Sequence, residues 1–337
     1  MKKSYLMMAA AATMFAACTQ SDFVNLVPET EQAIGFENYV GKSTRAEIDE
    51  IADLEKDGGK MYVWGWKTDA SSITYAIFGT VDAAGTEVYY DDAAATKWNY
   101  ADKKYWDKES TYDFYAVAPA APTGVTYTIN NAKKIKITGA TSAAADDATD
   151  YLIDRNGDEG HLGKDGGTVP FDFSHVMTKV EVKVRTDLNP AKEVVKLQAL
   201  TMSNWNSNAG TFTQVRTAAP DVATYNDEWS IATAGTAGSA AYLTGGDLTL
   251  SNAAEGQSLG SWIIVPQDVA TLTFTVSFTV DGETFVNHTG TIPNQQWGAD
   301  SHYTYTITVG PEAIEFDVNS VKGWAKNNGT DGDLDIK

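Results

Sequence analysis

The sequence is short of the residues on which many secreted enzymes and metalloproteins depend. It holds a single cysteine, Cys18, and four histidines in 337 residues. One cysteine excludes an intrachain disulfide, so a secreted fold must rest on its core alone. The histidines lack the spacing of an HExxH zinc site, and the chain contains no GxSxG, P-loop or GxGxxG motif. We therefore expect no enzyme, no catalytic residue, no cofactor and no metal site. The histidines fall at His161, His175, His288 and His302.

Basic residues are scarce as well. Lys and Arg number 25 against 45 Asp and Glu, and the net charge is −20 at pH 7. Such a surface repels nucleic acid and anionic lipid, so neither is expected as a partner of the mature protein. The hydrophobic fraction of 43% is enough for a substantial core. The composition therefore fits an extracellular protein with an ordinary folded core.

The first 18 residues, MKKSYLMMAAAATMFAAC, have the layout of a secretory signal. A basic pair precedes a short apolar run and then small residues. The apolar run is too short for a comfortable transmembrane helix. The Ala-Ala pair before Cys18 resembles a bacterial lipobox, in which the cysteine is acylated and becomes the new N-terminus. We interpret residues 1–18 as a lipoprotein signal peptide, and an ordinary signal peptide with an incidental cysteine is the alternative.

A strand-like segment follows a polar tether. In AIGFENYV, residues 33–40, the side chains of Ile34, Phe36 and Val40 fall on one side of an extended chain. An isolated arginine, Arg45, comes five residues later and forms a trypsin-like cleavage site. An exposed arginine in a linker is the alternative interpretation of this residue.

Most of the remaining chain favours β-strands. Turn residues separate strand-like runs at about the 8–12-residue spacing of a β-sandwich. The length favours two domains, and the turn DLNPA at 187–191 is the best boundary between them. Before it, residues 169–186 predict one long strand or a strand broken at a bulge. After it, Asp281-Gly282 predicts a tight hairpin turn, whereas residues 217–257 resemble long loops.

One acidic stretch resembles a calcium loop. Asp154, Asn156, Asp158 and Asp165 occupy positions 1, 3, 5 and 12 of that pattern. Glu159 stands where the loop needs glycine, and Asp165 is shorter than the usual bidentate Glu. We interpret the stretch as an acidic surface loop, with calcium binding as the alternative.

A group of aromatic residues in the first half could form a platform for sugars. At strand spacing, such residues are more often core and cross-strand partners. A surface glycan-binding lipoprotein that stays monomeric is nevertheless the alternative function. The group consists of Trp64, Trp66, Trp98, Tyr105 and Trp106.

Five parts of the chain together carry a resemblance to a known family. They are the lipobox at Cys18, STRAE at 43–47, and residues 105–119, 169–184 and 294–324. Together they resemble the fimbrillin (Mfa-like) family of Bacteroidota, the subunits of surface pili assembled by donor-strand exchange, and the resemblance covers most of the chain. It implies two tandem transthyretin-like β-sandwich domains. It also implies an outer-membrane lipoprotein precursor that carries an acyl chain such as palmitate on Cys18, and cleavage between Arg45 and Ala46 by an arginine-specific surface protease.

The resemblance also assigns a role to each end of the chain. The strand with Ile34, Phe36 and Val40 would leave after cleavage, and AIEFDV, with Ile314, Phe316 and Val318 on one face, would enter another subunit. The alternative for AIEFDV is a last strand packed within its own domain. The expected product is a fimbrial subunit of the stalk with a role in adhesion, with tip and anchor proteins as further partners. The expected divisions are a signal peptide at 1–18, a propeptide at 19–45, sandwich domains at 46–186 and 187–311, and a donor-strand segment at 312–337.

Overall fold

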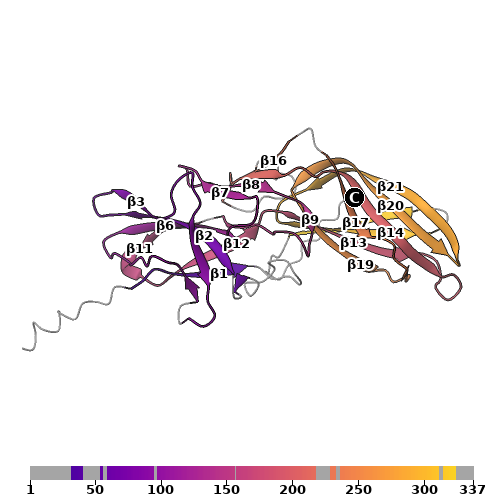
Figure 1. The fold of residues 1–337 in the computed structure, drawn as a ribbon, viewed down its shortest axis with the longest axis horizontal. Coiled ribbons are helices and arrows are strands. Elements are labelled where there is room, and N and C mark those ends of the chain that lie inside the picture. Colours follow the sequence, from indigo (N-terminus) through magenta and orange to yellow (C-terminus); the bar gives the residue numbers. More distant parts are fainter. Residues whose placement is uncertain are drawn as a thin grey trace, which may run out of the picture.

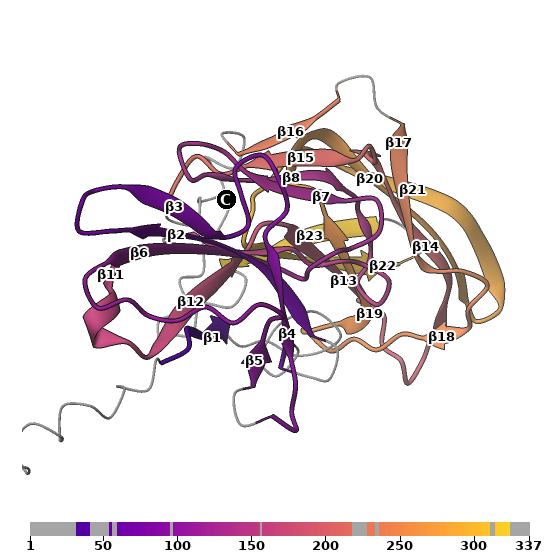
Figure 2. The ribbon, with the colours of Figure 1, turned by 60° about the vertical axis from the view of Figure 1, so that its left-hand side comes forward.

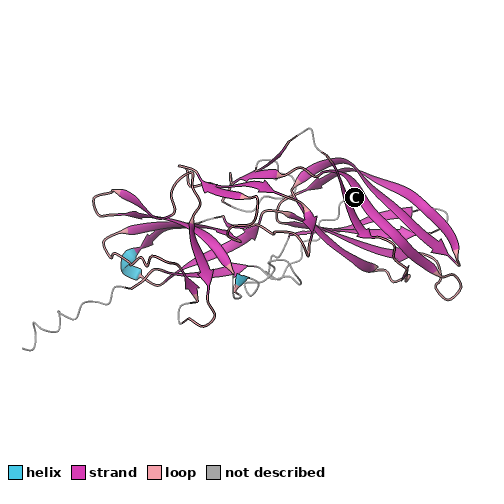
Figure 3. Cartoon of the chain, in the orientation of Figure 1, coloured by secondary structure: helices cyan, strands magenta, loops and turns pink. Residues whose placement is uncertain are grey.

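The chain folds almost entirely into β-strands in the computed structural model (Figures 1 and 3), which confirms the all-β prediction. The structure describes residues 32–40, 54–55, 59–94, 97–155, 157–217, 228–232, 236–310 and 314–323. For residues 38–40 and 314–323 it describes the backbone alone. Within these ranges, no helix combines the length and the apolar character that crossing a bilayer requires.

The N-terminal lobe contains a large sheet and a small sheet. The large sheet has the order β1-β12-β10-β6-β2-β4-β5, with β3 paired to β2 and β11 paired to β6. The small sheet has the order β16-β15-β8-β7. A short 3-10 helix, η2 (Gly163–Asp165), precedes β12. The large sheet consists of β1 (Gly35–Val40), β2 (Lys60–Thr68), β3 (Thr74–Phe78), β4 (Thr86–Tyr90), β5 (Trp98–Asn99), β6 (Thr111–Ala118), β10 (Leu152–Asp154), β11 (Asp158–Leu162) and β12 (Thr168–His175). The small sheet consists of β7 (Thr126–Ile129), β8 (Ile135–Ala140), β15 (Gly210–Thr213) and β16 (Trp229–Ile231).

The C-terminal lobe is a sandwich of two five-stranded sheets. One has the order β23-β22-β13-β19-β9, and the other has the order β17-β14-β20-β21 with β18 paired to β14. Apolar residues from both sheets form the C-terminal core between them. The strands are β9 (Ala143–Ala144), β13 (Thr178–Thr186), β14 (Val195–Asn206), β17 (Ala237–Leu243), β18 (Leu248–Thr249), β19 (Gln257–Ile264), β20 (Gln267–Val280), β21 (Glu283–Trp297), β22 (Ser301–Val309) and β23 (Ile314–Gly323).

The central strands β2 and β6 of the large sheet are buried on both faces over most of their length, which explains their dense apolar sequence. Along β2, Met61 and Val63 point into an outer core, whereas Trp64 and Trp66 point into a second core toward the small sheet. This alternation is the two-residue period of a strand. The second core, here called the junction core, also contains residues of the C-terminal half such as Val265. The two lobes therefore share apolar packing.

Two strands of the small sheet come from the C-terminal half of the sequence. Figure 2 shows β15 and β16 beside the violet β8 and β7. A buried ion pair holds this hairpin, because Arg155 Nη1 lies 2.8 and 2.9 Å from the two carboxylate oxygens of Glu228. Trp229 adds a bond from its indole N–H to the carbonyl of Val176 at 2.7 Å. The expected division into a domain at 46–186 and another at 187–311 therefore does not account for this hairpin, which comes from the second range but lies in the N-terminal lobe.

The chain crosses from the N-terminal to the C-terminal sandwich at Val176 and Met177, before the predicted boundary at the turn 187–191. Residues 169–186 are neither one strand nor a bulged strand, because β12 lies in the large sheet and β13 pairs with β22 and β19 in the C-terminal lobe. Val176 and Met177 separate them, and both are fully buried in the junction core. Their burial breaks the in-out alternation that a continuous half-buried strand would show.

The predicted hairpin in the C-terminal lobe is confirmed. Val280 pairs with Glu283, and Asp281 and Gly282 both have positive φ angles, 48° and 89°, as a type I′ turn requires. The interpretation of residues 217–257 as loops is wrong in part, since β16, β17 and β18 lie there. β17 consists mostly of small residues, and β16 and β18 are only three and two residues long, so none of the three shows an extended apolar alternation.

Candidate functional site

The first strand, β1, is an edge strand of the large sheet. It runs parallel to β12, with Gly35 opposite Thr168 and Phe36 opposite Val169. Figure 2 shows the two strands side by side at the lower edge of the N-terminal lobe. An edge strand can leave a sheet without disrupting a ladder on both of its sides.

A second segment clamps the beginning of β1 from its other side. The amide of Ile34 donates to the carbonyl of Lys104 at 2.9 Å, and the amide of Trp106 donates to the carbonyl of Gln32 at 3.0 Å. The hydroxyl of Tyr100 donates to the carbonyl of Ile34 at 2.7 Å. Burial raises the pKa of Tyr100, so this hydroxyl stays protonated and remains a donor at neutral pH. The strand therefore lies in a groove with hydrogen-bonding walls.

The groove floor is aromatic. Phe36 is only 3% exposed, and its ring centroid lies 5.3 Å from Phe78, 5.7 Å from Tyr100, 5.9 Å from Phe114 and 5.7 Å from Phe171. Three of the contacts are edge-on and the Phe171 contact is stacked, both favourable geometries for ring pairs. We call these four surrounding rings the aromatic cage.

The two described apolar side chains of the strand account for much of its attachment. Ile34, at 2% exposed, and Phe36 are both buried in the outer core, as the sequence pattern suggested. Burial of two such side chains contributes about 3–6 kcal/mol before the cost of ordering the strand, at roughly 1.5–3 kcal/mol each. The side chain of Val40, the third member of the predicted face, lies outside the described residues.

The predicted cleavage site lies beyond the described part of β1. The strand ends at Val40, Arg45 and Ala46 fall in an undescribed stretch, and the buried Leu54 is the next described residue. The chain from β1 onward reaches the rest of the sandwich only through residues 41–53. Cys18 also lies outside the described residues, so its role stays a prediction.

The C-terminal strand, β23, lies at the edge of a sheet in the other lobe. It pairs with β22 in antiparallel register, with Ile314 opposite Val309, Phe316 opposite Ile307 and Val318 opposite Tyr305. In the single chain, therefore, this strand adds to its own C-terminal sandwich. Its predicted role in another subunit is not tested by that placement, since an edge strand is also the kind that can exchange.

The four tryptophans of the aromatic group are core residues, as interpreted from their strand spacing, and the alternative of a sugar platform is wrong. Trp64, Trp66, Trp98 and Trp106 are all at least nine-tenths buried and pack in the N-terminal cores. Tyr105, at 47% exposed, is the one member of the group with an open ring face. The aromatic residues at strand spacing are core residues, so they offer no stacked surface to an oligosaccharide.

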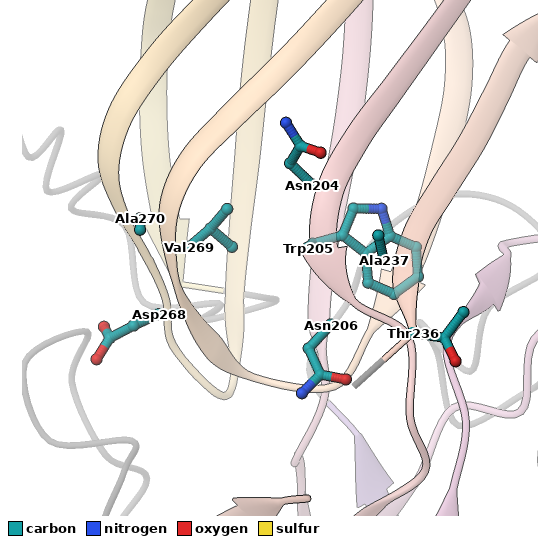
Figure 4. Close-up of a pocket in the computed structure, with 8 residues that line it drawn as sticks. All are labelled: Asn204, Trp205, Asn206, Thr236, Ala237, Asp268, Val269 and Ala270. Atoms are coloured by element: carbon teal, nitrogen blue, oxygen red, sulfur yellow. The ribbon is translucent and has the colours of Figure 1, made fainter. Parts of the chain in front are cut away.

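A shallow pocket in the C-terminal lobe is no better placed for sugar binding. Figure 4 shows it between β14 and β20, with Trp205 on one wall. The Trp205 ring is 4% exposed, the Asn204 amide bonds to Thr273 at 2.7 Å, and the backbone amide of Asn206 bonds to Gln267 at 2.7 Å. The wall groups are thus engaged within the protein.

The calcium-like stretch does not form a surface loop throughout. Asp154 is buried at the end of β10, Asp158 lies on β11 beside His161 at 3.0 Å, and Asp165 lies in η2. Asn156 lies outside the described residues. In the part of the chain that the structure describes, no three His, Cys, Asp or Glu side chains converge as metal ligands would.

The histidine in the FSHVM segment is a packed residue in the described structure. His175 Nδ1 lies 2.8 Å from a carboxylate oxygen of Asp150, and both side chains are buried. Sequence reasoning missed Tyr100, whose role depends on a carbonyl 66 residues away.

The fold thus defines a β-sandwich protein whose N-terminal edge strand fills an aromatic groove. A family model described as fimbrillin-like matches residues 44–324, and the chain belongs to that family. The fimbrium subunit Fim1C of Phocaeicola vulgatus is 26% identical over 209 residues, which are 56% of this chain and 52% of Fim1C. The chain therefore spans about half the length of this curated relative.

Solved structures show the same fold. A fimbrial protein from Bacteroides vulgatus has a TM-score of 0.65 at 17% identity, with 87% of this chain and 99% of that chain covered. A candidate cell adhesion protein from Bacteroides ovatus has a TM-score of 0.51 at 16% identity, with 88% and 99% covered. At these identities the likeness concerns the fold alone.

Proposed function

We propose that the protein is a structural subunit of a surface fimbria with a role in adhesion. It is exported as a lipoprotein through Cys18 to the outer membrane, cleaved after Arg45 by an arginine-specific surface protease, and polymerised by donor-strand exchange. Membership of the fimbrillin-like family supports the fimbrial role, and the curated relative Fim1C is a fimbrium subunit, not an enzyme. The stalk is the proposed position, with other fimbrial subunits as partners.

One observation carries the proposal. The strand β1 buries Ile34 and Phe36 in the outer core, yet the chain that joins it to the rest of the sandwich contains the arginine at position 45. While the chain is intact, a released strand rebinds at the high effective concentration of an intramolecular segment. Cleavage removes that advantage, so the strand can diffuse away and leave the groove open.

An open groove is a docking site for another strand. It offers a row of unpaired backbone groups along β12 and an apolar floor, which together favour addition of an extended segment. The C-terminal strand has the required alternation, with Ile314, Phe316 and Val318 on one face. Two copies can therefore join when β23 of one fills the groove of the next.

The test is assembly of two donor-strand variants. Protein lacking residues 312–337 and full-length Phe316→Asp, both treated with protease, should fail to form the heat-resistant ladders that the parent forms on gels. A charge at Phe316 would enter an apolar groove at a cost of several kcal/mol, roughly 2–7 kcal/mol for an unpaired polar group. Glu315→Ala, a polar position on the same strand, is the matched control and should assemble.

The point variant distinguishes a loss of assembly from a folding defect. Since β23 pairs with β22 in the single chain, its deletion can weaken the C-terminal sandwich, whereas Phe316→Asp keeps the backbone ladder. Thermal unfolding should show a folded monomer for Phe316→Asp. Ladders from either folded, protease-treated variant would contradict donor-strand assembly.

A further inference from the structure

The two ends of the described chain carry nearly the same five residues. AIGFE spans residues 33–37 and AIEFD spans residues 313–317. Alanine, isoleucine and phenylalanine recur at the same spacing, and each match ends in an acidic residue. The first copy begins the strand that fills the groove and the second begins the C-terminal edge strand.

The groove gives each of these positions a distinct environment. Ile34 and Phe36 are buried, Gly35 between them is also buried beside the exposed Thr168, and Glu37 is exposed and lies opposite Pro170. An isoleucine site, an aromatic cage and a solvent-facing site therefore follow one another along the groove. A second strand with the order Ile-x-Phe-acid matches all three sites when it runs in the same direction.

We infer that β23 of a second copy of this chain enters the groove in the polarity and register of β1. Phe316 then occupies the aromatic cage, Ile314 occupies the site of Ile34, and Glu315 lies opposite Thr168. The inference rests on the proposed function and adds to it the direction of the strand and the residue that the cage recognises.

The backbone partners in the groove favour this direction. Ile34 directs both its N–H and its C=O away from β12, to Lys104 and Tyr100 respectively. A strand of the same polarity presents the N–H and C=O of Ile314 to these partners. A reversed strand with Phe316 still in the cage turns those groups toward the opposite edge, and it places Val318 in the isoleucine site.

The register of the incoming strand can be measured with a disulfide, because position 35 lies opposite Thr168 at a suitable distance. A Cβ at Gly35 would lie 3.9 Å from the Cβ of Thr168, within the span of about 3.5–4.5 Å that a disulfide joins. It would also lie 3.0 Å from the Thr168 methyl group, and replacement of Thr168 by cysteine removes that crowding. The chain's single native cysteine, Cys18, precedes the proposed cut, so mature subunits would carry only the engineered thiols.

The experiment compares two cysteine pairs in full-length protein assembled on cells. Thr168→Cys with Glu315→Cys reports the same polarity as β1. Thr168→Cys with Asp317→Cys reports the reversed strand, because Asp317 then lies opposite Thr168. Gly35→Cys with Thr168→Cys in the uncleavable Arg45→Ala background is the positive control for disulfide geometry and should close within one chain.

We expect the first pair to give covalent ladders on denaturing, non-reducing gels and the second pair to give none. On reducing gels, both variants should form heat-resistant ladders to the same extent, which shows that the cysteine substitutions leave assembly itself intact. Covalent ladders from the Asp317 pair alone would show a reversed strand. Absence of covalent ladders from both pairs, in polymers that still form, would show another register; either result overturns the inference and leaves donor-strand assembly intact. Absence of any polymer, including from the parent, would instead refute the proposed function.

Discussion

The two sandwiches differ in where their strands come from. The C-terminal sandwich takes its main strands from residues 178–323, with only the two-residue β9 from earlier in the chain. The N-terminal sandwich depends on two outside pieces, β1 at its edge and the β15–β16 hairpin from the C-terminal half. The N-terminal sandwich is therefore the one that a cut after Arg45 would separate from one of its strands.

The two outside pieces are also held differently. The hairpin is continuous with the chain on both sides and is fixed by the buried Arg155–Glu228 pair. The strand β1 is held by apolar side chains and backbone pairing, and its link to the sandwich contains the predicted cut after Arg45. This contrast separates a permanent connection between the lobes from a replaceable one.

The largest expected effect on stability comes from emptying the aromatic cage. Phe36→Ala in an uncleavable Arg45→Ala background should lower the free energy of unfolding by about 3–5 kcal/mol, since it leaves a cavity among four rings. Urea denaturation measures the change. Glu37→Ala, on the neighbouring exposed position, should change stability by less than about 0.5 kcal/mol. Equal effects of the two substitutions would show that β1 is not held by the cage.

The second-largest loss of unfolding free energy is expected from breaking the Arg155–Glu228 ion pair that holds the hairpin. Glu228→Gln leaves the buried Arg155 without its carboxylate and should cost about 3 kcal/mol of unfolding free energy. Glu87→Gln is a matched control, because the Lys60–Glu87 pair has the same 2.8 Å separation but both side chains are about two-fifths exposed. That control should cost no more than about 1 kcal/mol. Similar losses in denaturation curves would argue against the hairpin as a firm connection.

The C-terminal sandwich should respond to acid through Glu181. Burial raises the pKa of this carboxyl, but hydrogen bonds from His302 and Ser258, with the charge of Lys183, outweigh it and lower the pKa from 4.5 to about 2. Because the folded pKa is lowered, the stabilisation is present above pH 4.5 and is lost as pH falls toward 2. At 1.36 kcal/mol per unit the shift corresponds to about 3 kcal/mol, and solvent screening of the partly exposed carboxyl lowers the expected contribution to about 2 kcal/mol.

Glu181→Gln removes this contribution, so its stability should fall less steeply between pH 4.5 and 2. Denaturation at a series of pH values compares the variant with the parent. Parallel curves for the two proteins would show that Glu181 does not contribute to the acid sensitivity of the C-terminal sandwich.

The smallest expected effect concerns the wall of the groove. Tyr100→Phe keeps the ring of the cage but removes the hydrogen bond to the Ile34 carbonyl, at a cost of about 1 kcal/mol. Tyr105→Phe, on an exposed ring nearby, should change little. Denaturation of both variants in the Arg45→Ala background distinguishes them, and a neutral Tyr100→Phe would mean that the Tyr100 hydroxyl does not contribute to holding the strand.

Elements that depend on local turn residues and local apolar alternation could be predicted from the sequence. The Asp281-Gly282 turn sits between alternating apolar runs, and the turn type fixes the register of β20 and β21. The face of β1 could be predicted for the same reason, since Ile34 and Phe36 share one side of the strand and the flanking Ala33 and Glu37 are exposed. Local alternation is a property of the segment itself.

Long-range pairing was not readable in this way. The parallel partner of β1 lies more than 130 residues away, and nothing in AIGFENYV indicates β12. The boundary at 187 was misplaced because turn residues mark an end of a strand, not the sheet to which it belongs. The tryptophans were ambiguous because a strand buried on both faces shows no polar side to distinguish a core from an exposed platform.

The most direct test of the account is the N-terminal residue of the protein recovered from assembled surface fimbriae. Intact mass and N-terminal peptide analysis should find a chain that begins at Ala46, with residues 32–40 absent from the assembled material. Arg45→Ala should leave uncleaved monomers. Assembled subunits that retain an acylated Cys18 and the β1 segment would contradict the claim that this strand must leave before another can enter.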